Sequence, residues 1–170
     1  EEINNIQINY IKFHNSLKKI RFIERFNQNI DNVKFPEGLE VLSFGLNFNQ
    51  PIDYVKFPDG LKVLKLGMKF NQNIDNIKFP DSLEELNLGY CFNHNIDNVK
   101  FPDSLEKLDL GYCFNQNIDN VKFPDSLVEL DLASFNQNID QVKFPYNLKK
   151  LRFGCAFNQP IDYLPEGLYK

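Results

Sequence analysis

Apolar residues along the chain fall into two short frames that alternate with polar turns. One frame reads Leu-x-x-Leu-x-Leu, as in residues 83–88, and the other reads Ile-x-x-Val-x-Phe, as in residues 118–123. Each run is too short for an ordinary helix, and most runs are followed by Gly, Ala or Pro, of which Gly and Pro end regular elements. The pattern predicts a repeated order of strand, turn, return segment and Pro turn. It leaves open whether the return segment is a short strand or simply extended.

A Phe-Asn pair marks the period of this pattern, which is 22 residues with one interval of 21. The phenylalanines of the pair are Phe26, Phe48, Phe70, Phe92, Phe114, Phe135 and Phe157. A single unit of this size cannot bury its own apolar face, so copies must stack. We therefore expect a repeat solenoid, mainly β, with one parallel sheet on the concave face and extended or short-strand return segments.

The repeats leave no linker, so residues 1–170 are expected to form a single solenoid domain. Residues 1–10 are then a leading segment, 11–25 a partial first coil, 26–156 six coils, and 157–170 a shortened last coil. Neither end has the composition of a polar cap, and uncapped coils favour self-association.

Three repeated positions have expected structural roles. The Phe of each Phe-Asn pair should stack on its neighbours as an aromatic ladder in the core. The following Asn, as in Asn71 and Asn93, can donate and accept hydrogen bonds and so bridge the coils above and below. The Asp column could suggest calcium, but it lacks the glycine pattern of calcium-binding solenoids, so we interpret it as turn hydrogen bonding. It consists of Asp31, Asp53, Asp75, Asp97, Asp119, Asp140 and Asp162.

The Leu-x-x-Leu-x-Leu frame, followed by Gly and then Phe-Asn-x-x-Ile, resembles the FNIP repeat, a subfamily of leucine-rich repeats. The motif reads FNQPI at residues 48–52 and 157–161, and the resemblance extends over nearly the whole chain from Ile11. FNIP repeats occur in social amoebae and in giant viruses that infect amoebae, often after an F-box. The resemblance implies a protein-interaction array, such as the recognition arm of an F-box receptor. Residues 1–10 are too short for an F-box, so that role rests on the resemblance alone.

Residues between the strand leucines should point outward on the concave face. This face is expected to be basic at both ends and acidic from Glu84 to Asp131, with Tyr90 and Tyr112 beside the acidic stretch. Such a surface suits a basic or mixed-charge segment of a partner protein, although it could also be a solvated face that only maintains solubility. The candidate partner-binding residues are Lys65, Glu85, Asn87, Tyr90, Lys107, Asp109, Tyr112, Glu129, Asp131 and Arg152.

Composition limits the other possibilities. The net charge of −4 argues against a nucleic-acid partner, and no apolar run is long enough to span a membrane. Three cysteines, an odd number, favour a reducing compartment over a disulfide framework. We therefore expect a cytoplasmic protein, in the host cytoplasm or the virion if the source is a virus.

No active site, cofactor site or metal site is predicted. His94 stands where other repeats have Gln, so we interpret it as a surface substitution. Cys91 and Cys113 share a repeat position, which makes zinc conceivable with His94, but no fourth ligand is visible. Free cysteines are more often small buried residues. The sequence thus predicts a protein-binding scaffold and not an enzyme, with a structural component of a particle or filament as the alternative.

Overall fold

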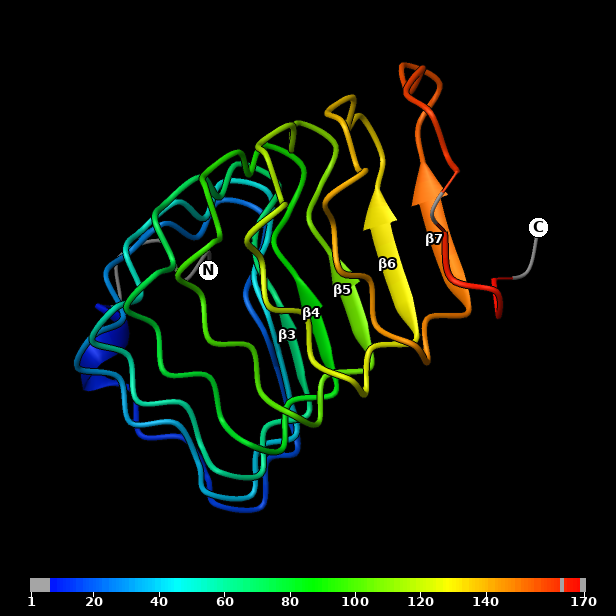
Figure 1. The fold of residues 1–170 in the computed structure, drawn as a ribbon. Coiled ribbons are helices and arrows are strands. Elements are labelled where there is room, and N and C mark those ends of the chain that lie inside the picture. The colour runs from blue at the N-terminus through cyan, green and yellow to red at the C-terminus, as the bar shows by residue number, and fades with distance from the viewer. Residues whose placement is uncertain (1–6, 163, 169–170) are drawn as a thin grey trace.

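The computed structural model describes residues 7–162 and 164–168 as one stack of coils (Figure 1). Residues 1–6 of the expected leading segment, and residues 163 and 169–170 of the expected last coil, lie outside the described residues. A short 3-10 helix, η1 (Ile8–Tyr10), precedes seven strands. These are β1 (Lys19–Arg21), β2 (Val41–Ser43), β3 (Val63–Lys65), β4 (Glu85–Asn87), β5 (Lys107–Asp109), β6 (Glu129–Leu132) and β7 (Lys150–Phe153).

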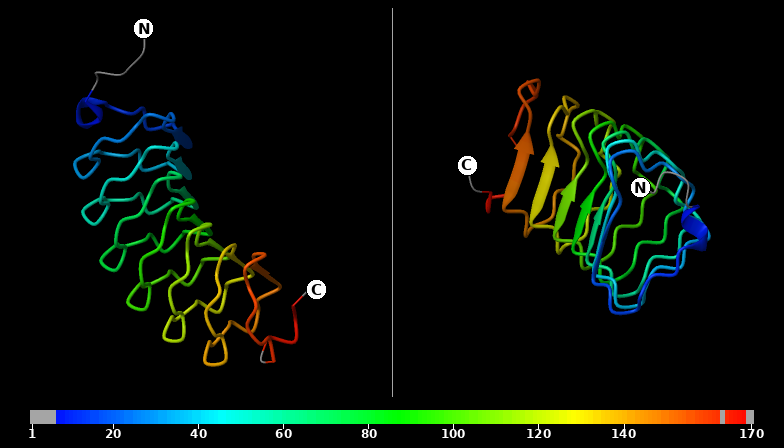
Figure 2. Two further views of the ribbon diagram at one scale, coloured as in Figure 1. Left: turned by 90° about the horizontal axis from the view of Figure 1, so that it is seen from above. Right: turned by 180° about the vertical axis from the view of Figure 1, so that it is seen from behind.

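The strands form one parallel sheet in sequence order, and each coil contributes one strand. The register places equivalent positions side by side, as in Leu64↔Leu86 and Leu86↔Leu108. The second residue of each strand, which is Ile20 in β1 and a leucine in β2 to β7, points into the core, and the residues on either side of it point outward, because side chains alternate along a strand. Seen from above, the stack curves with the strands on its inner side (Figure 2). The predicted parallel sheet on the concave face is confirmed, and the return segments in the described residues are extended and contain no strand.

Phenylalanine rings form the expected ladder through the core. The rings of the Phe-Asn pairs stack from Phe26 to Phe157 with centroid separations of 6.0 to 6.4 Å. At both ends of the stack a second Phe replaces the last strand leucine, and it packs on the ladder, as Phe44 does on Phe48 at 4.0 Å. Offset stacking of this kind adds to the free energy gained by burial.

Glycine closes the strand because the backbones of successive coils touch there. Gly89 and Gly111 have φ of +82° and +86°, which a residue with a side chain rarely adopts. A Cβ on Gly111 would also collide with the carbonyl oxygen of Gly89 in the previous coil. The turn after the strand therefore requires glycine in these coils.

The repeated amides of the motif link the coils along the outer surface of this corner. The side-chain oxygen of Asn71 accepts the backbone N–H of Asn93 at 3.0 Å, and that of Asn93 accepts the N–H of Asn115 at 3.0 Å. The bridging role is thus confirmed in part: the exposed side-chain oxygen accepts a hydrogen bond from the following coil, but within the described residues these side chains do not form the expected second bond to the preceding coil. In the turn that follows, Asn95 accepts the N–H of Asp97 and donates to its carboxylate. The same pairing recurs at Asp31, Asp75, Asp119 and Asp140, which supports the turn interpretation of the Asp column.

The first coil is covered more fully than the sequence suggested. Ile8 of η1 is buried against the core, and its N–H donates to the side-chain oxygen of Gln28 at 2.9 Å. At the other end, Phe153 and Phe157 are only partly buried and Ile161 is exposed. Both ends of the described stack leave apolar surface uncovered, since Phe22 and Phe26 of the first coil are also only partly buried and Ile23 is exposed.

Candidate functional site

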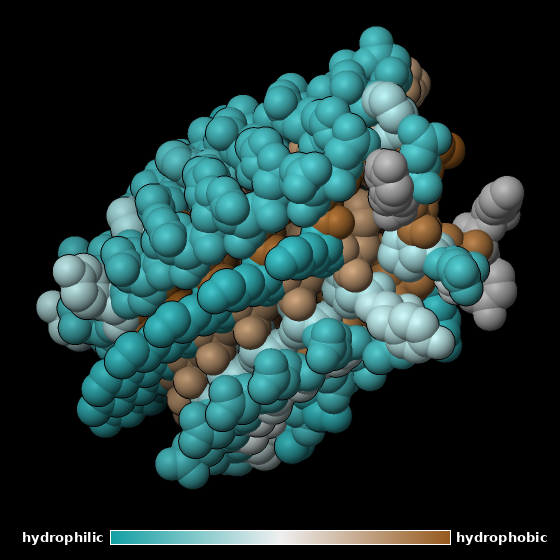
Figure 3. Space-filling view, viewed as in Figure 1, coloured by the Kyte–Doolittle hydropathy of each residue, from teal (hydrophilic) through white to brown (hydrophobic). Residues whose placement is uncertain are grey.

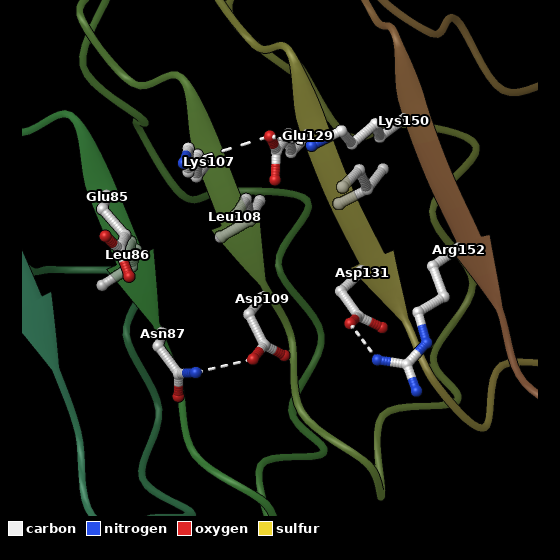
Figure 4. A pocket seen from close by; sticks show the side chains of 11 residues that line it. Glu85, Leu86, Asn87, Lys107, Leu108, Asp109, Glu129, Asp131, Lys150 and Arg152 are labelled. Atoms are coloured by element: carbon white, nitrogen blue, oxygen red, sulfur yellow. Dashed lines mark hydrogen bonds and ion pairs between the residues drawn. The ribbon is translucent and has the colours of Figure 1, made fainter. Parts of the chain in front are cut away.

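The concave face has a shallow hollow of about 290 Å³ over β4 to β7. Its floor is formed at Leu86, Leu108 and Leu130, the central strand residues, whose side chains are buried. Two rows of polar residues cross it, since the first and third residues of every strand face the same way. Figure 4 shows one row with Glu85, Lys107, Glu129 and Lys150, and a second with Asn87, Asp109, Asp131 and Arg152.

Charges on this face are paired with one another. The Glu129 carboxylate lies 2.7 Å from the amine of Lys150 and 4.0 Å from that of Lys107. The same side chain has its pKa lowered, chiefly by the hydrogen bond from Lys150. The Asp131 carboxylate contacts Arg152 at 2.9 Å, and Lys65 contacts Glu85 at 2.6 Å. The expected acidic stretch is therefore largely neutralised by cations of its own face.

Asp109 is the exception in this network. Its carboxylate accepts a hydrogen bond from Asn87 at 2.6 Å and from the N–H of Gly111 at 2.9 Å. No Lys or Arg of the described residues forms an ion pair with it. Burial raises the pKa of Asp109, and the neighbouring Asp131 raises it further. Among the carboxylates that line the hollow, Asp109 is therefore the one without an ion pair to the described residues, and a cation brought by a partner would supply it.

A row of exposed apolar side chains borders the face just beyond the strands. Tyr90 and Tyr112 stack with ring centroids 4.7 Å apart and an interplanar angle of 8°. Leu46 and Met68 occupy the same repeat position in the two preceding coils, directly after Gly45 and Gly67. The exposed fractions of Leu46, Met68, Tyr90 and Tyr112 are 41%, 46%, 45% and 46%. We call these four residues the corner stripe.

Rows of this kind are a general feature of the surface. Figure 3 shows hydrophilic rows that run along the stack with hydrophobic rows between them. Because equivalent residues lie one coil apart, any repeat position occupied by similar residues becomes a continuous column. Apolar columns that remain exposed are the unusual ones, since soluble proteins seldom expose contiguous apolar surface without a use for it.

The structure brings together most of the residues proposed from the sequence. Seven of them line the hollow: Glu85, Asn87, Lys107, Asp109, Glu129, Asp131 and Arg152. Lys65 lines an adjoining hollow over β1 to β4, and Tyr90 and Tyr112 lie outside both, in the corner stripe. Sequence reasoning missed Lys150, Leu46 and Met68. Aligning the residue after the strand glycine in every coil would have found the last two.

The remaining candidates for chemistry occupy structural or exposed positions. His94 lies 3.0 Å from the carbonyl oxygen of Asn71, where Gln116 in the next coil contacts the equivalent carbonyl. Cys91 is half-buried and Cys113 is exposed, so the expectation of buried cysteines was wrong for this position. The cause is the tight glycine corner, which turns the following two residues outward. Within the described part of the chain, no three His, Cys, Asp or Glu residues are grouped to hold a metal.

The repeat geometry and the motif agree with a known family. The FNIP Repeat family model matches residues 26–55, 48–91, 92–134 and 135–169, which is most of the chain. The chain belongs to the FNIP repeat family. FNIP repeats thus account for its period, its Phe ladder and its amide-rich turns.

Comparison with solved structures finds CroV588, described as a novel circular LRR protein. The two chains share 26% sequence identity with a TM-score of 0.43. The similarity covers 92% of this chain but 36% of CroV588, so this chain spans about a third of that protein's length. No curated protein matches the chain. Within the described residues, the structure contains no helix long and apolar enough to cross a membrane.

Proposed function

We propose that this FNIP array is a non-catalytic scaffold that binds a partner protein on its concave sheet face. The observation that carries the proposal is the contrast between positions within each strand. The central residue is Leu in β2 to β7, whereas the third, outward residue changes from Ser43 to Lys65, Asn87, Asp109, Asp131 and Arg152. Packing requires the buried central position to be uniform, whereas the outward position can vary from coil to coil and so determine which partner binds.

The paired charges on the face also bear on the choice of partner. Exposed ion pairs contribute little to folding stability, so stability alone does not account for their arrangement from β3 to β7. A surface whose charges are already paired accepts a mixed-charge segment, because a partner can exchange one contact for another without leaving a charge unpaired. Asp109, which forms no ion pair with the described residues, adds a place for one basic side chain.

The larger context is part of the same proposal. The array would act as the recognition arm of a longer protein, with an F-box receptor as one example, in a reducing cytoplasmic setting. The three cysteine thiols support this setting, because two of them are exposed and would be open to oxidation outside a reducing compartment.

Affinity capture from a lysate of the source organism tests the proposal. The bait is compared with the double variant Asp109→Lys/Asp131→Lys on the face. The matched control is Asp81→Lys/Asp103→Lys, which makes the same charge change at exposed positions of the Pro turns. A protein retained by the wild type and the control but lost with the face variant supports the scaffold. Equal capture by all three baits counts against the concave face.

A structural component assembled end to end is the second candidate. The partly exposed Phe153 and Phe157 of the last coil favour it, because stacking a further coil on them would bury apolar surface. Sedimentation velocity across a range of concentrations separates the two. An oligomer that grows with concentration supports assembly, and a monomer throughout counts against it.

A further inference from the structure

We infer that the corner stripe is the docking surface for an amphipathic helix of the partner, with one apolar residue per turn and a basic residue beside Tyr112. The inference rests on the proposed function and specifies the partner's chemistry. It depends on the spacing of the stripe, on its length and on the charge beside it.

The four side chains form one continuous surface. The carbonyl oxygens of Leu46, Met68 and Tyr90 accept hydrogen bonds from the coil that follows each of them, at 2.8 to 2.9 Å. Their backbones are therefore held one coil apart, and the 4.7 Å separation of the two tyrosine rings shows that side chains there keep the same spacing. The stripe is a ladder of apolar groups and not four separate exposed residues.

The spacing of the stripe selects the conformation of the partner. Adjacent parallel strands lie about 4.8 Å apart, whereas same-face residues of an extended segment are about 6.6 Å apart. The side chains of an extended partner that runs along the stack would therefore lose register with the stripe within two coils. A helix rises about 5.4 Å per turn, so one apolar residue per turn nearly matches the coils. Both tyrosines add large, rigid contact area of the kind that is enriched at interface centres.

The ends of the stripe define the length of the helix. In the preceding coil the equivalent residue is Glu24, and in the following coil the corner is one residue shorter, at Ala133 and Ser134. The stripe thus has three steps between its four residues, or roughly 14 Å. About three turns, or ten to twelve residues of helix, cover that distance.

Charge beside the stripe gives the helix a direction. At the Met68 coil the neighbouring strand residue is Lys65, which is already paired with Glu85 at 2.6 Å. At the Tyr112 coil it is Asp109, which lacks an ion-pair partner among the described residues and holds the turn by accepting the N–H of Gly111. A Lys or Arg on the last turn of the helix can reach this carboxylate, so the basic end of the partner lies at Tyr112.

The test uses two peptide display libraries panned on the purified chain. One encodes 14-residue helical peptides, and the other has the same composition with a central proline that prevents a continuous helix. Enrichment from the helical library is expected, with apolar residues three and four apart and Lys or Arg near one end. Enrichment from the proline library alone overturns the inference.

An enriched peptide then locates the site. Met68 is the single methionine of the chain, so its ¹³C-labelled methyl group gives one NMR signal from the middle of the stripe. Peptide binding should shift that signal, and Tyr112→Ser should weaken the affinity at least about tenfold. Tyr146→Ser, which removes an exposed tyrosine from a Pro turn, is the matched control and should leave the affinity unchanged. A bound peptide that leaves the Met68 signal and the Tyr112→Ser affinity unaltered overturns the inference.

The two proposals fail in different ways. If affinity capture finds a partner that depends on Asp109 and Asp131 but no helical peptide reaches the stripe, the scaffold stands and the helix inference fails. If neither library is enriched and capture is insensitive to the face variant, both fail.

Discussion

Two columns of large apolar residues lie two positions apart in the same coils, and they differ completely in burial. Phe48, Phe70, Phe92 and Phe114 have exposed fractions of 0%, whereas the four residues of the corner stripe range from 41% to 46%. The buried column uses one residue type in every coil. The exposed column contains a leucine, a methionine and two tyrosines.

The difference shows how a repeat divides its positions between architecture and recognition. A ring within the core must match the space left by the coils on either side, because protein interiors are close-packed. A residue of the corner stripe contacts only solvent and its neighbours in the stripe, so its identity can change without disturbing the stack. Uniformity therefore marks packing, and variation within an apolar column marks a surface open to selection by a partner.

The largest expected effect comes from the buried column. Phe92→Ala removes a ring stacked on Phe70 and Phe114 and leaves a cavity in mid-array. We expect a loss of about 3–5 kcal/mol in the free energy of unfolding, measured by urea denaturation. Tyr90→Ala, two residues earlier on the corner stripe, should cost less than about 1 kcal/mol. Equal losses would contradict the distinction between the columns.

The glycine that closes the strand lies directly before the corner stripe, and its substitution should have the next largest effect on stability. Gly111→Ala places a Cβ against the carbonyl of Gly89 and forces an alanine to positive φ. We expect a loss of about 2–3 kcal/mol in unfolding free energy. Gly60→Ala, where a Cβ finds no close contact and φ is not positive, is the control and should change stability by less than about 1 kcal/mol.

The amide bridges outside the Phe column should contribute less. Asn93→Ala removes the oxygen that accepts the N–H of Asn115 and the amide of Gln116, each at 3.0 Å. We expect a loss of about 1–2 kcal/mol in the free energy of unfolding by urea, because a backbone donor loses its protein partner. The control is Asn98→Ala, at an exposed turn position of the same coil, and a similar loss there would show that the bridge is not the cause.

Ion pairs on the concave face should matter least for stability. The pair between Arg152 and Asp131 is partly exposed, with 72% of the Arg152 side chain accessible. Arg152→Ala should lower the free energy of unfolding by less than about 1 kcal/mol, and the loss should shrink in high salt. A loss as large as that of Asn93→Ala would mean that the face contributes to architecture as well as to recognition.

The pH dependence of stability tests whether burial makes the ionised Asp109 unfavourable in the folded chain. Burial raises the pKa of Asp109 in the folded chain above its ordinary value of 3.8. The folded state thus holds this proton more tightly, so a destabilising contribution is absent at pH below 3.8 and appears as pH rises through the folded pKa. Asp109→Asn removes that contribution. Denaturation from acidic to neutral pH should show the variant gaining stability relative to the wild type, and a constant difference would contradict the raised pKa.

Several features could be predicted from the sequence because they repeat. The period, the parallel sheet and the Phe ladder follow from apolar positions that recur in every coil, and each was confirmed. The charge of the concave face was harder to predict, because each strand contributes only two or three outward residues. Glu129 looked like part of an acidic stretch, and only its distances to Lys107 and Lys150 show that it is paired.

The sequence by itself determined which positions must be buried and how often the chain must turn. This follows because apolar periodicity and the Gly and Pro breakers act locally, within one coil. Only the tertiary structure decided which side chains become neighbours across coils: the pairing that leaves Asp109 without a cation, the cover of η1 on the first coil, and the joining of Leu46, Met68, Tyr90 and Tyr112 into one stripe. Contacts between residues 22 positions apart depend on register, curvature and rotamers, which the stacking of the whole array sets.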